Sequence, residues 1–239
     1  MPTKRPQLAN GEIYHIVIRT MEGLKLFRNE KDYLRMIHDL FVFNNRVSTS
    51  SSYRNTINKS GLDPDLLPRK NQIRRRLLVE ILAFCLMPNH VHLLVRQLQD
   101  NGISKFMQKI GAGYGGYYNK KYKRNGHLFQ GKYRIVHIKN DKQLITIFVY
   151  IHTNPTAILV PYWKERGIKG RDLKKIIKFL ENYRWSSYSD YLGNKIFPSV
   201  TSREFLTETV GGIKGARRFV NDWLQFKKEI ADLDKIALE

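Results

Sequence analysis

The sequence predicts an α+β domain built on an antiparallel sheet, with helices on one face of that sheet. The hydrophobic content of 42% over 239 residues is enough for a folded core. Predicted strands and helices follow one another in the order β-α-β-β-α-β-α, and the two adjacent strands, at 77–86 and 90–96, indicate a hairpin. This mixture of a hairpin with intervening helices is typical of the α+β class.

The first half of the predicted domain contains a strand, a helix and a long polar tract. Residues 12–19 alternate apolar and polar side chains and are rich in β-branched residues, which predicts a strand. A helix is expected over 30–44, because Asn29 can cap its first turn and its apolar residues recur on one face. The tract from 46 to 76 holds a serine-rich run and a basic cluster, and we interpret it as a mobile insertion.

The second half begins with the hairpin, whose turn is predicted at Met87, Pro88 and Asn89. A helix is expected over 103–122, and its glycines, Gly111, Gly113, Gly115 and Gly116, suggest close approach of another backbone or a ligand. A strand at 129–138 and a helix at 141–154 follow. Helices are also expected at 171–182 and 214–231. We therefore divide the chain into a domain over 8–160 and a basic, mainly helical C-terminal extension over 161–239.

The charge of the chain indicates a polyanionic partner. Lys and Arg number 42 against 21 Asp and Glu, a net charge of +21. Nucleic acid relieves the repulsion among these cations and releases its own counterions on binding. A membrane is not expected as a partner, because the longest apolar stretch, 77–87, contains Glu80 and is too short to span a bilayer. The single cysteine, Cys85, and the lack of a signal-peptide pattern fit a cytoplasmic protein.

The pair His90 and His92 is a candidate metal site. Residues i and i+2 of a strand share one face, so these two imidazoles point the same way while Val91 points into the core. Neighbouring imidazoles are common metal ligands. The alternative interpretation is two surface histidines.

Tyr150 and Asn154 form a second candidate pair. Residues i and i+4 of a helix lie on one face, so a phenol and a carboxamide oxygen are presented together. Asn154 can add a hard oxygen ligand to the two imidazoles, a combination that suits Mg²⁺ or Mn²⁺ better than zinc. Alternatively, Tyr150 is a core aromatic residue and Asn154 caps the helix before Pro155.

The tract from 111 to 134 interleaves tyrosines with cations. Cations hold phosphates and aromatic faces stack on unpaired bases, so this composition predicts contact with single strands or hairpins. The predicted DNA-binding residues are Lys120, Lys121, Tyr122, Lys123, Arg124, Lys132 and Arg134, and Tyr114, Tyr117 and Tyr118 are further candidates for stacking. The alternative is an amphipathic helix with a solvated basic face.

Four segments, in this order, resemble the signature of REP-associated tyrosine transposases. They are MPNHVHLLV (87–95), YKRNGHLFQGKYR (122–134), YIHTNP (150–155) and WSSY (185–188). The resemblance covers about residues 10–192 and points to the HUH superfamily of single-tyrosine transposases, with an IS200-like transposase domain of ferredoxin-like α+β fold. One departure follows Pro155, where the family often reads Val-Arg-Ala-Gly-Leu-Val and this chain has Thr-Ala-Ile-Leu-Val.

The resemblance implies a role for each candidate. His90, His92 and Asn154 would bind a divalent metal, Mg²⁺ or Mn²⁺, and Tyr150 would attack single-stranded DNA beside a hairpin to give a 5′-phosphotyrosine and a free 3′-hydroxyl. A phenol has a pKa of about 10, so its ionisation needs help from the metal or from His152 or His137.

Two alternatives remain open for the function. One is a nickase domesticated for a host role, and the other is an inactive protein that binds DNA or RNA hairpins. The oligomeric state stays open between a monomer and a homodimer.

Overall fold

The computed structural model describes residues 6–46, 75–168 and 170–226, so nearly all of the predicted insertion lies outside the described residues. One antiparallel sheet has the strand order β2-β3-β1-β4. Its strands are Ile13–Arg19 (β1), Val79–Met87 (β2), His90–Gln97 (β3) and Arg134–Ile138 (β4). Helix α1 (Glu30–Val42) connects β1 to β2, and α3 (Gly102–Lys121) connects β3 to β4. This β-α-β-β-α-β arrangement is ferredoxin-like and confirms the predicted α+β class.

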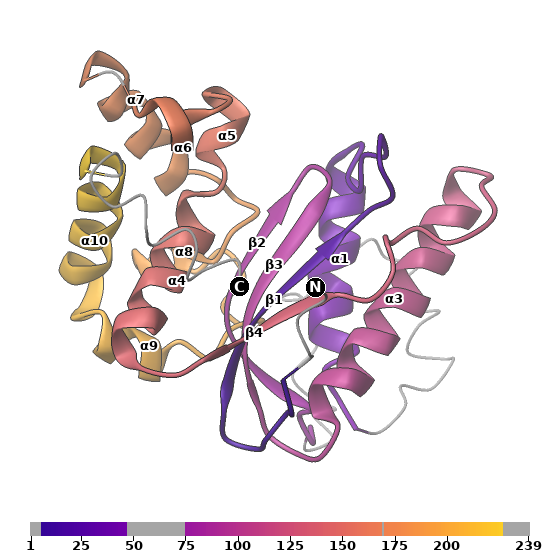
Figure 1. The fold of residues 1–239 in the computed structure, drawn as a ribbon. Helices are drawn as coiled ribbons and strands as arrows, with labels where there is room; N and C mark the ends of the chain where they lie inside the picture. The colour runs from indigo at the N-terminus through magenta and orange to yellow at the C-terminus, as the bar shows by residue number, and fades with distance from the viewer. Residues whose placement is uncertain (1–5, 47–74, 169, 227–239) are drawn as a thin grey trace.

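Helices cover both faces of the sheet, whereas we expected them on one (Figure 1). The expectation holds for α1 and α3, which pack on the face that receives Tyr14, Ile16 and Ile18. The other face is covered by α4 (Asp141–Thr153) and the C-terminal helices α7 (Gly170–Glu181), α8 (Tyr188–Tyr191) and α10 (Gly212–Phe226). The physical reason is the composition of β2, which is apolar at nearly every position and therefore needs cover on both faces.

Short helices link these larger elements on the second face. They are α5 (Thr156–Leu159), α6 (Trp163–Arg166) and α9 (Glu204–Thr209). Trp163 is 1% exposed and belongs to the same core as α4 and α10, so α6 is fixed against the domain. No helix within residues 6–46, 75–168 and 170–226 is long and apolar enough to cross a membrane.

Strand β4 is shorter than predicted, because residues 129–133 leave the sheet. Only an isolated bridge joins Phe129 to Thr20, and Gly131 adopts a φ of 62°. A left-handed residue of this kind interrupts the extended conformation that a strand requires. The chain therefore forms a loop before Arg134, where regular pairing with β1 begins.

The WSSY segment fastens the C-terminal part of the chain to the free edge of β2. The carbonyl of Trp185 accepts a hydrogen bond from the amide of Leu86 (2.8 Å), and the amide of Ser187 donates to the carbonyl of Phe84 (3.0 Å). The hydroxyl of Ser187 accepts from the Phe84 amide (3.0 Å) and lies 2.9 Å from Nε2 of His152. These contacts satisfy backbone groups of an edge strand and fix the position of the Trp185 ring.

One of the glycines in α3 is explained by close packing. A Cβ atom at Gly113 would lie 2.2 Å from the ring of Phe43, so no larger residue fits there without displacing that ring. A Cβ atom at Gly111, Gly115 or Gly116 would meet nothing within 4 Å. The predicted close approach is therefore to a side chain, and it concerns Gly113 alone.

The buried carboxylate of Asp32 joins α1 to the C-terminal end of α3. It accepts hydrogen bonds from Lys121 (2.5 Å), Tyr122 (2.6 Å) and Tyr117 (2.8 Å), and from the backbone amide of Arg28 (2.8 Å). Burial alone would raise the pKa of Asp32, but the hydrogen bonds from Lys121 and its neighbours hold it below the ordinary value. The carboxylate is thus ionised at neutral pH and orders this end of the helix.

Replacing Asp32 by asparagine is expected to lower the free energy of unfolding by about 3 kcal/mol at pH 7, because it leaves the donors around a buried acceptor without their charge partner. A lowered pKa gives stability that is present above the unfolded pKa of about 3.9 and is lost as the pH falls. The difference from wild type should therefore shrink below about pH 4. Urea unfolding measures it, and the exposed Asp222→Asn is the control. An equal loss in both variants would contradict this role.

Candidate active site

The structure brings the predicted nucleophile and both predicted histidine ligands together. His90 and His92 begin β3 and face α4, and their ring centroids lie 4.9 Å apart. The Tyr150 ring on α4 meets His92 edge-on, with the centroids 5.5 Å apart. Because α4 crosses the face of the sheet that carries both histidines, residues 58 positions apart (150 − 92 = 58) become neighbours.

A third histidine, which the sequence interpretation missed, completes the cluster. His15 lies on β1, beside β3, and is 1% exposed. Its ring is parallel to that of His92 (centroids 5.2 Å apart, 8° between planes), and its Nε2 lies 3.0 Å from Nδ1 of His92. It also meets the Tyr150 ring edge-on at 5.9 Å. The available signal was a histidine inside an apolar strand, in EIYHIVIR.

Hydrogen bonds at Nδ1 bear on which ring nitrogen of His90 and of His92 carries the lone pair that a metal needs. Nδ1 of His90 lies 2.7 Å from the side-chain oxygen of Asn89, which only accepts, so Nδ1 carries the proton. The lone pair of His90 is then on Nε2. At His92, Nδ1 shares a hydrogen bond with Nε2 of His15, and the tautomer in which Nδ1 donates leaves the lone pair on Nε2, a buried atom with no hydrogen-bond partner among the described residues. Orientation of a ligating imidazole through its second nitrogen is the usual arrangement at metal sites.

Both candidate ligands are neutral at physiological pH. Burial, together with the nearby cations Arg19 and Lys164, lowers the pKa of His90 to about 3. Burial also holds the pKa of His92 well below its ordinary value, with His90, His15 and the same cations contributing. A metal ligand must be the unprotonated imidazole, so this environment favours ligation.

A lysine from the C-terminal extension lies over the candidate nucleophile. Nζ of Lys164, on α6, is 4.0 Å from the centroid of the Tyr150 ring. This is a cation–π contact, and a cation in this place also favours the negative charge of a phenolate. The Tyr150 side chain is buried, with 4% exposed. Sequence reasoning gave Lys164 as one of several cations that could hold a DNA hairpin, but it could not place Lys164 beside Tyr150, because only the packing of α6 brings it there.

Asn154 follows Tyr150 by one helical turn and is the C-cap of α4. The side-chain nitrogen of Asn154 donates to the Tyr150 carbonyl (2.8 Å), which leaves its side-chain oxygen as the group that can meet a metal. In the described part of the chain, no group of three or more His, Cys, Asp or Glu side chains could hold a metal ion. The side-chain oxygen of Asn154 is a candidate for a third ligand beside His90 and His92.

The two histidines proposed to assist Tyr150 have other surroundings. His152 is fully buried against Phe148 and the hydroxyl of Ser187, and burial lowers its pKa to about 3. His137 lies on β4 and pairs with Glu12 at 2.7 Å. The groups that do contact the Tyr150 ring are His15, His92 and Lys164.

The predicted DNA-binding residues fall into two groups. Lys120, Lys123, Lys132 and Arg134 are exposed. Lys121 and Tyr122 bind Asp32, and Arg124 donates to the side chain of Asn119 and the carbonyl of His127. Base stacking by Tyr114 and Tyr118 was a wrong expectation, because both rings are fully buried between α3 and the sheet.

Comparison with known proteins agrees with this geometry. Residues 39–154, which contain both histidines, Tyr150 and Asn154, match the family of IS200-like transposases. The class of protein that the fold and this segment resemble is thus the transposases, and over 39–154 the chain is similar to the IS200-like family. No curated protein matches the chain at a significant level.

A solved structure with a similar fold is that of a REP-associated tyrosine transposase bound to a REP hairpin. The two chains align with a TM-score of 0.50 and 12% identity, over 85% of this chain and 93% of the other. At this identity the likeness shows a shared fold, and it extends well beyond the residues that the family match covers.

Proposed function

We propose that this transposase cleaves and rejoins single-stranded DNA beside hairpins, with Tyr150 as the nucleophile and a divalent metal as cofactor. The observation that carries the proposal is the contact of Tyr150 with His92, beside His90 and beneath Lys164. The similar solved structure, a transposase with a bound hairpin, supports hairpin DNA as the substrate class. The net charge of +21 supports a nucleic-acid partner.

The residues at the site fit a metal. Nε2 of His92 is a buried polar atom without a hydrogen-bond partner in the described chain, and an atom of this kind is costly to leave unsatisfied. His90, His92 and the amide oxygen of Asn154 would hold Mg²⁺ or Mn²⁺. When bound, the ion would supply positive charge at the scissile phosphate.

The chain's own groups account for the remaining chemistry. The Tyr150 oxygen forms a bond to phosphorus, the bond from phosphorus to the 3′ oxygen breaks, and that oxygen leaves as a 3′-hydroxyl after taking a proton. The phosphotyrosine is a diester like the bond it replaces. A 3′-hydroxyl can therefore attack it in reverse and join strands without ATP.

Lys164 has a direct part in this scheme, since its charge lies beside the phenol that must become negative. Lys164→Gln is expected to lower the rate of cleavage about 100-fold while hairpin binding changes little, and Lys164→Arg should restore part of the rate. Single-turnover cleavage assays and gel-shift titrations measure the two effects. Lys142→Gln, an exposed lysine at the start of α4, is the control with the same change of charge. A wild-type rate in Lys164→Gln would remove Lys164 from the proposal.

One observation favours a second candidate function, a hairpin-binding protein that does not cleave. Tyr150 is 4% exposed, so its oxygen must become accessible before it can meet a phosphate. The deciding experiment incubates the protein with labelled single-stranded oligonucleotides from the DNA that flanks its own gene, with Mg²⁺ or Mn²⁺. A cleaved strand with a protein-linked product, both lost with EDTA, supports the transposase. Binding without cleavage across metals and flanking sequences supports the second candidate, and RNA hairpins as competitors test the choice of nucleic acid.

A further inference from the structure

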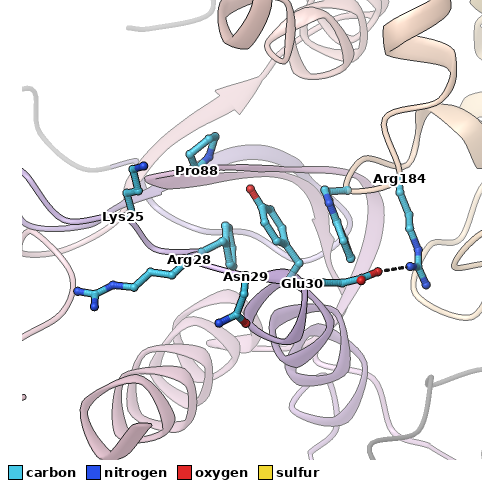
Figure 2. Close-up of a pocket in the computed structure, with 9 residues that line it drawn as sticks. Lys25, Arg28, Asn29, Glu30, Pro88 and Arg184 are labelled. Carbon is cyan, nitrogen blue, oxygen red and sulfur yellow. Dashed lines mark hydrogen bonds and ion pairs between the residues drawn. The ribbon is translucent and has the colours of Figure 1, made fainter. Parts of the chain in front are cut away.

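A depression with a volume of about 580 Å³ opens beside the start of α1 (Figure 2). It lies between the segment before α1, the turn from β2 to β3, and the WSSY segment. The proposed cleavage chemistry uses none of its residues. Trp185, the first residue of the WSSY motif, forms part of its wall. The proposed cleavage chemistry does not explain why this motif carries a tryptophan.

Aromatic rings form one wall of the depression. The rings of Phe27 and Tyr33 stack with their centroids 4.2 Å apart, and those of Tyr33 and Trp185 stack at 4.5 Å. Tyr33 and Trp185 are only partly buried, and because Tyr33 lies between Phe27 and Trp185 it presents its edge to the depression, beside the Trp185 ring. The position of Trp185 is rigid, because its carbonyl is held by the edge of β2. A fixed apolar wall of this kind suits a flat, unsaturated ring such as a nucleobase.

Cations surround this wall. Lys25, Arg28 and Arg184 all line the depression and are exposed. Arg184 is oriented by an ion pair with Glu30 (2.5 Å), as Figure 2 shows, and its guanidinium lies 5.1 Å from the centroid of the Trp185 ring. The guanidinium of Arg28 lies 4.2 Å from the Tyr122 ring. With one carboxylate against three cations, the depression carries a positive charge that suits phosphate.

The depression lies on the other side of a single turn from the active site. Pro88 lines it, and the Pro88 carbonyl accepts a hydrogen bond from the amide of Leu26 (2.7 Å). The next residue, Asn89, binds Nδ1 of His90 (2.7 Å). A strand of DNA that leaves the histidines across the tip of this hairpin therefore runs toward the depression.

We propose that this depression binds one unpaired nucleotide of the same DNA strand whose scissile phosphate enters the active site. The base lies against the Tyr33 and Trp185 rings, and Lys25 and Arg184 hold the phosphate. The volume lies within the range of small-ligand sites, which suits one nucleotide. The inference rests on the proposed function, since it assigns a place to part of the same substrate.

The test removes one base at a time from a hairpin oligonucleotide that the protein cleaves. Each oligonucleotide carries an abasic residue at one position of its single-stranded flank, and its affinity for Tyr150→Phe protein is measured so that cleavage does not interfere. At one position, loss of the base should weaken binding about tenfold. In Trp185→Ala that sensitivity should disappear, with the abasic and the complete oligonucleotide binding equally.

Two further variants keep the test independent of the folding of Trp185→Ala. In wild-type protein, a neutral methylphosphonate linkage at the sensitive nucleotide should weaken binding, because it removes the phosphate charge that Lys25 holds. In Lys25→Ala the same linkage should no longer weaken binding. Arg217→Gln is the matched control, since Arg217 is an exposed arginine in an ion pair with Glu181 (2.9 Å) outside the depression. It should keep both the abasic and the methylphosphonate sensitivity.

The outcomes separate this inference from the function on which it rests. If wild-type protein cleaves, but no abasic position depends on Trp185 and no linkage depends on Lys25, the nucleotide site is wrong and the transposase stands. If wild-type protein neither binds nor cleaves any hairpin oligonucleotide, the proposed function fails and the nucleotide site fails with it.

Discussion

Replacing Tyr150 by phenylalanine is expected to abolish both the cleaved strand and the covalent protein–DNA product. The change removes only the oxygen that would bond to phosphorus, so cleavage should fall by about 10³-fold or more. The ring remains, and with it the edge-on contact with His92 and the cation–π contact with Lys164. The fold and the affinity for hairpin DNA should therefore be close to those of wild type.

Tyr162→Phe is the matched control for this experiment. Tyr162 also lies beside α6, but its side chain is 67% exposed and its ring contacts Arg166. Denaturing gels of both variants with the same labelled oligonucleotide give the comparison directly. A covalent product that persists in Tyr150→Phe and disappears in Tyr162→Phe would assign the nucleophile to the other tyrosine. Persistence in both variants would require a nucleophile outside this pair.

Local periodicity in the sequence was sufficient to place the two histidines and the tyrosine on the right elements. Alternation in a strand predicts that His90 and His92 share a face, and both do face α4. The boundaries of α1, β3 and α4 also lie within two residues of those predicted. In each case the information is contained within about ten consecutive residues, which is the range over which these patterns act.

What the sequence did not predict depends on contacts between distant segments. His15 enters the site because β1 pairs with β3, and Lys164 does so because α6 packs over α4. No local pattern encodes either contact. The prediction of base stacking by Tyr114 and Tyr118 was wrong for a related reason. Tyrosines among cations are suited to stacking on bases, but these two recur at helical spacing, and their rings fill the core beneath α3. When a helix is both basic and rich in tyrosine at helical spacing, its buried face must be known before its tyrosines can be assigned to the core or to DNA.

The second large effect is expected at His92. His92→Gln should abolish cleavage with either Mg²⁺ or Mn²⁺, because it removes the buried Nε2 that would hold the ion and that has no hydrogen-bond partner among the described residues. Binding of Mn²⁺, followed by calorimetry or by electron paramagnetic resonance, should be lost in parallel. Hairpin binding should persist, since the predicted phosphate contacts of Lys120 and its neighbours lie on another element.

His15 distinguishes a metal site from a merely structural cluster of histidines. His15→Phe keeps a ring against His92 but removes the group that orients its Nδ1, so the affinity for metal should fall about 10–100-fold and excess Mn²⁺ should restore cleavage. His38→Gln is the control, because His38 is also buried but lies on α1, on the opposite face of the sheet. If His15→Phe and His38→Gln lower cleavage equally, and excess Mn²⁺ rescues neither, both act through stability and the cluster is structural. Rescue of His15→Phe alone would show that His15 acts through a metal ion that the reaction uses.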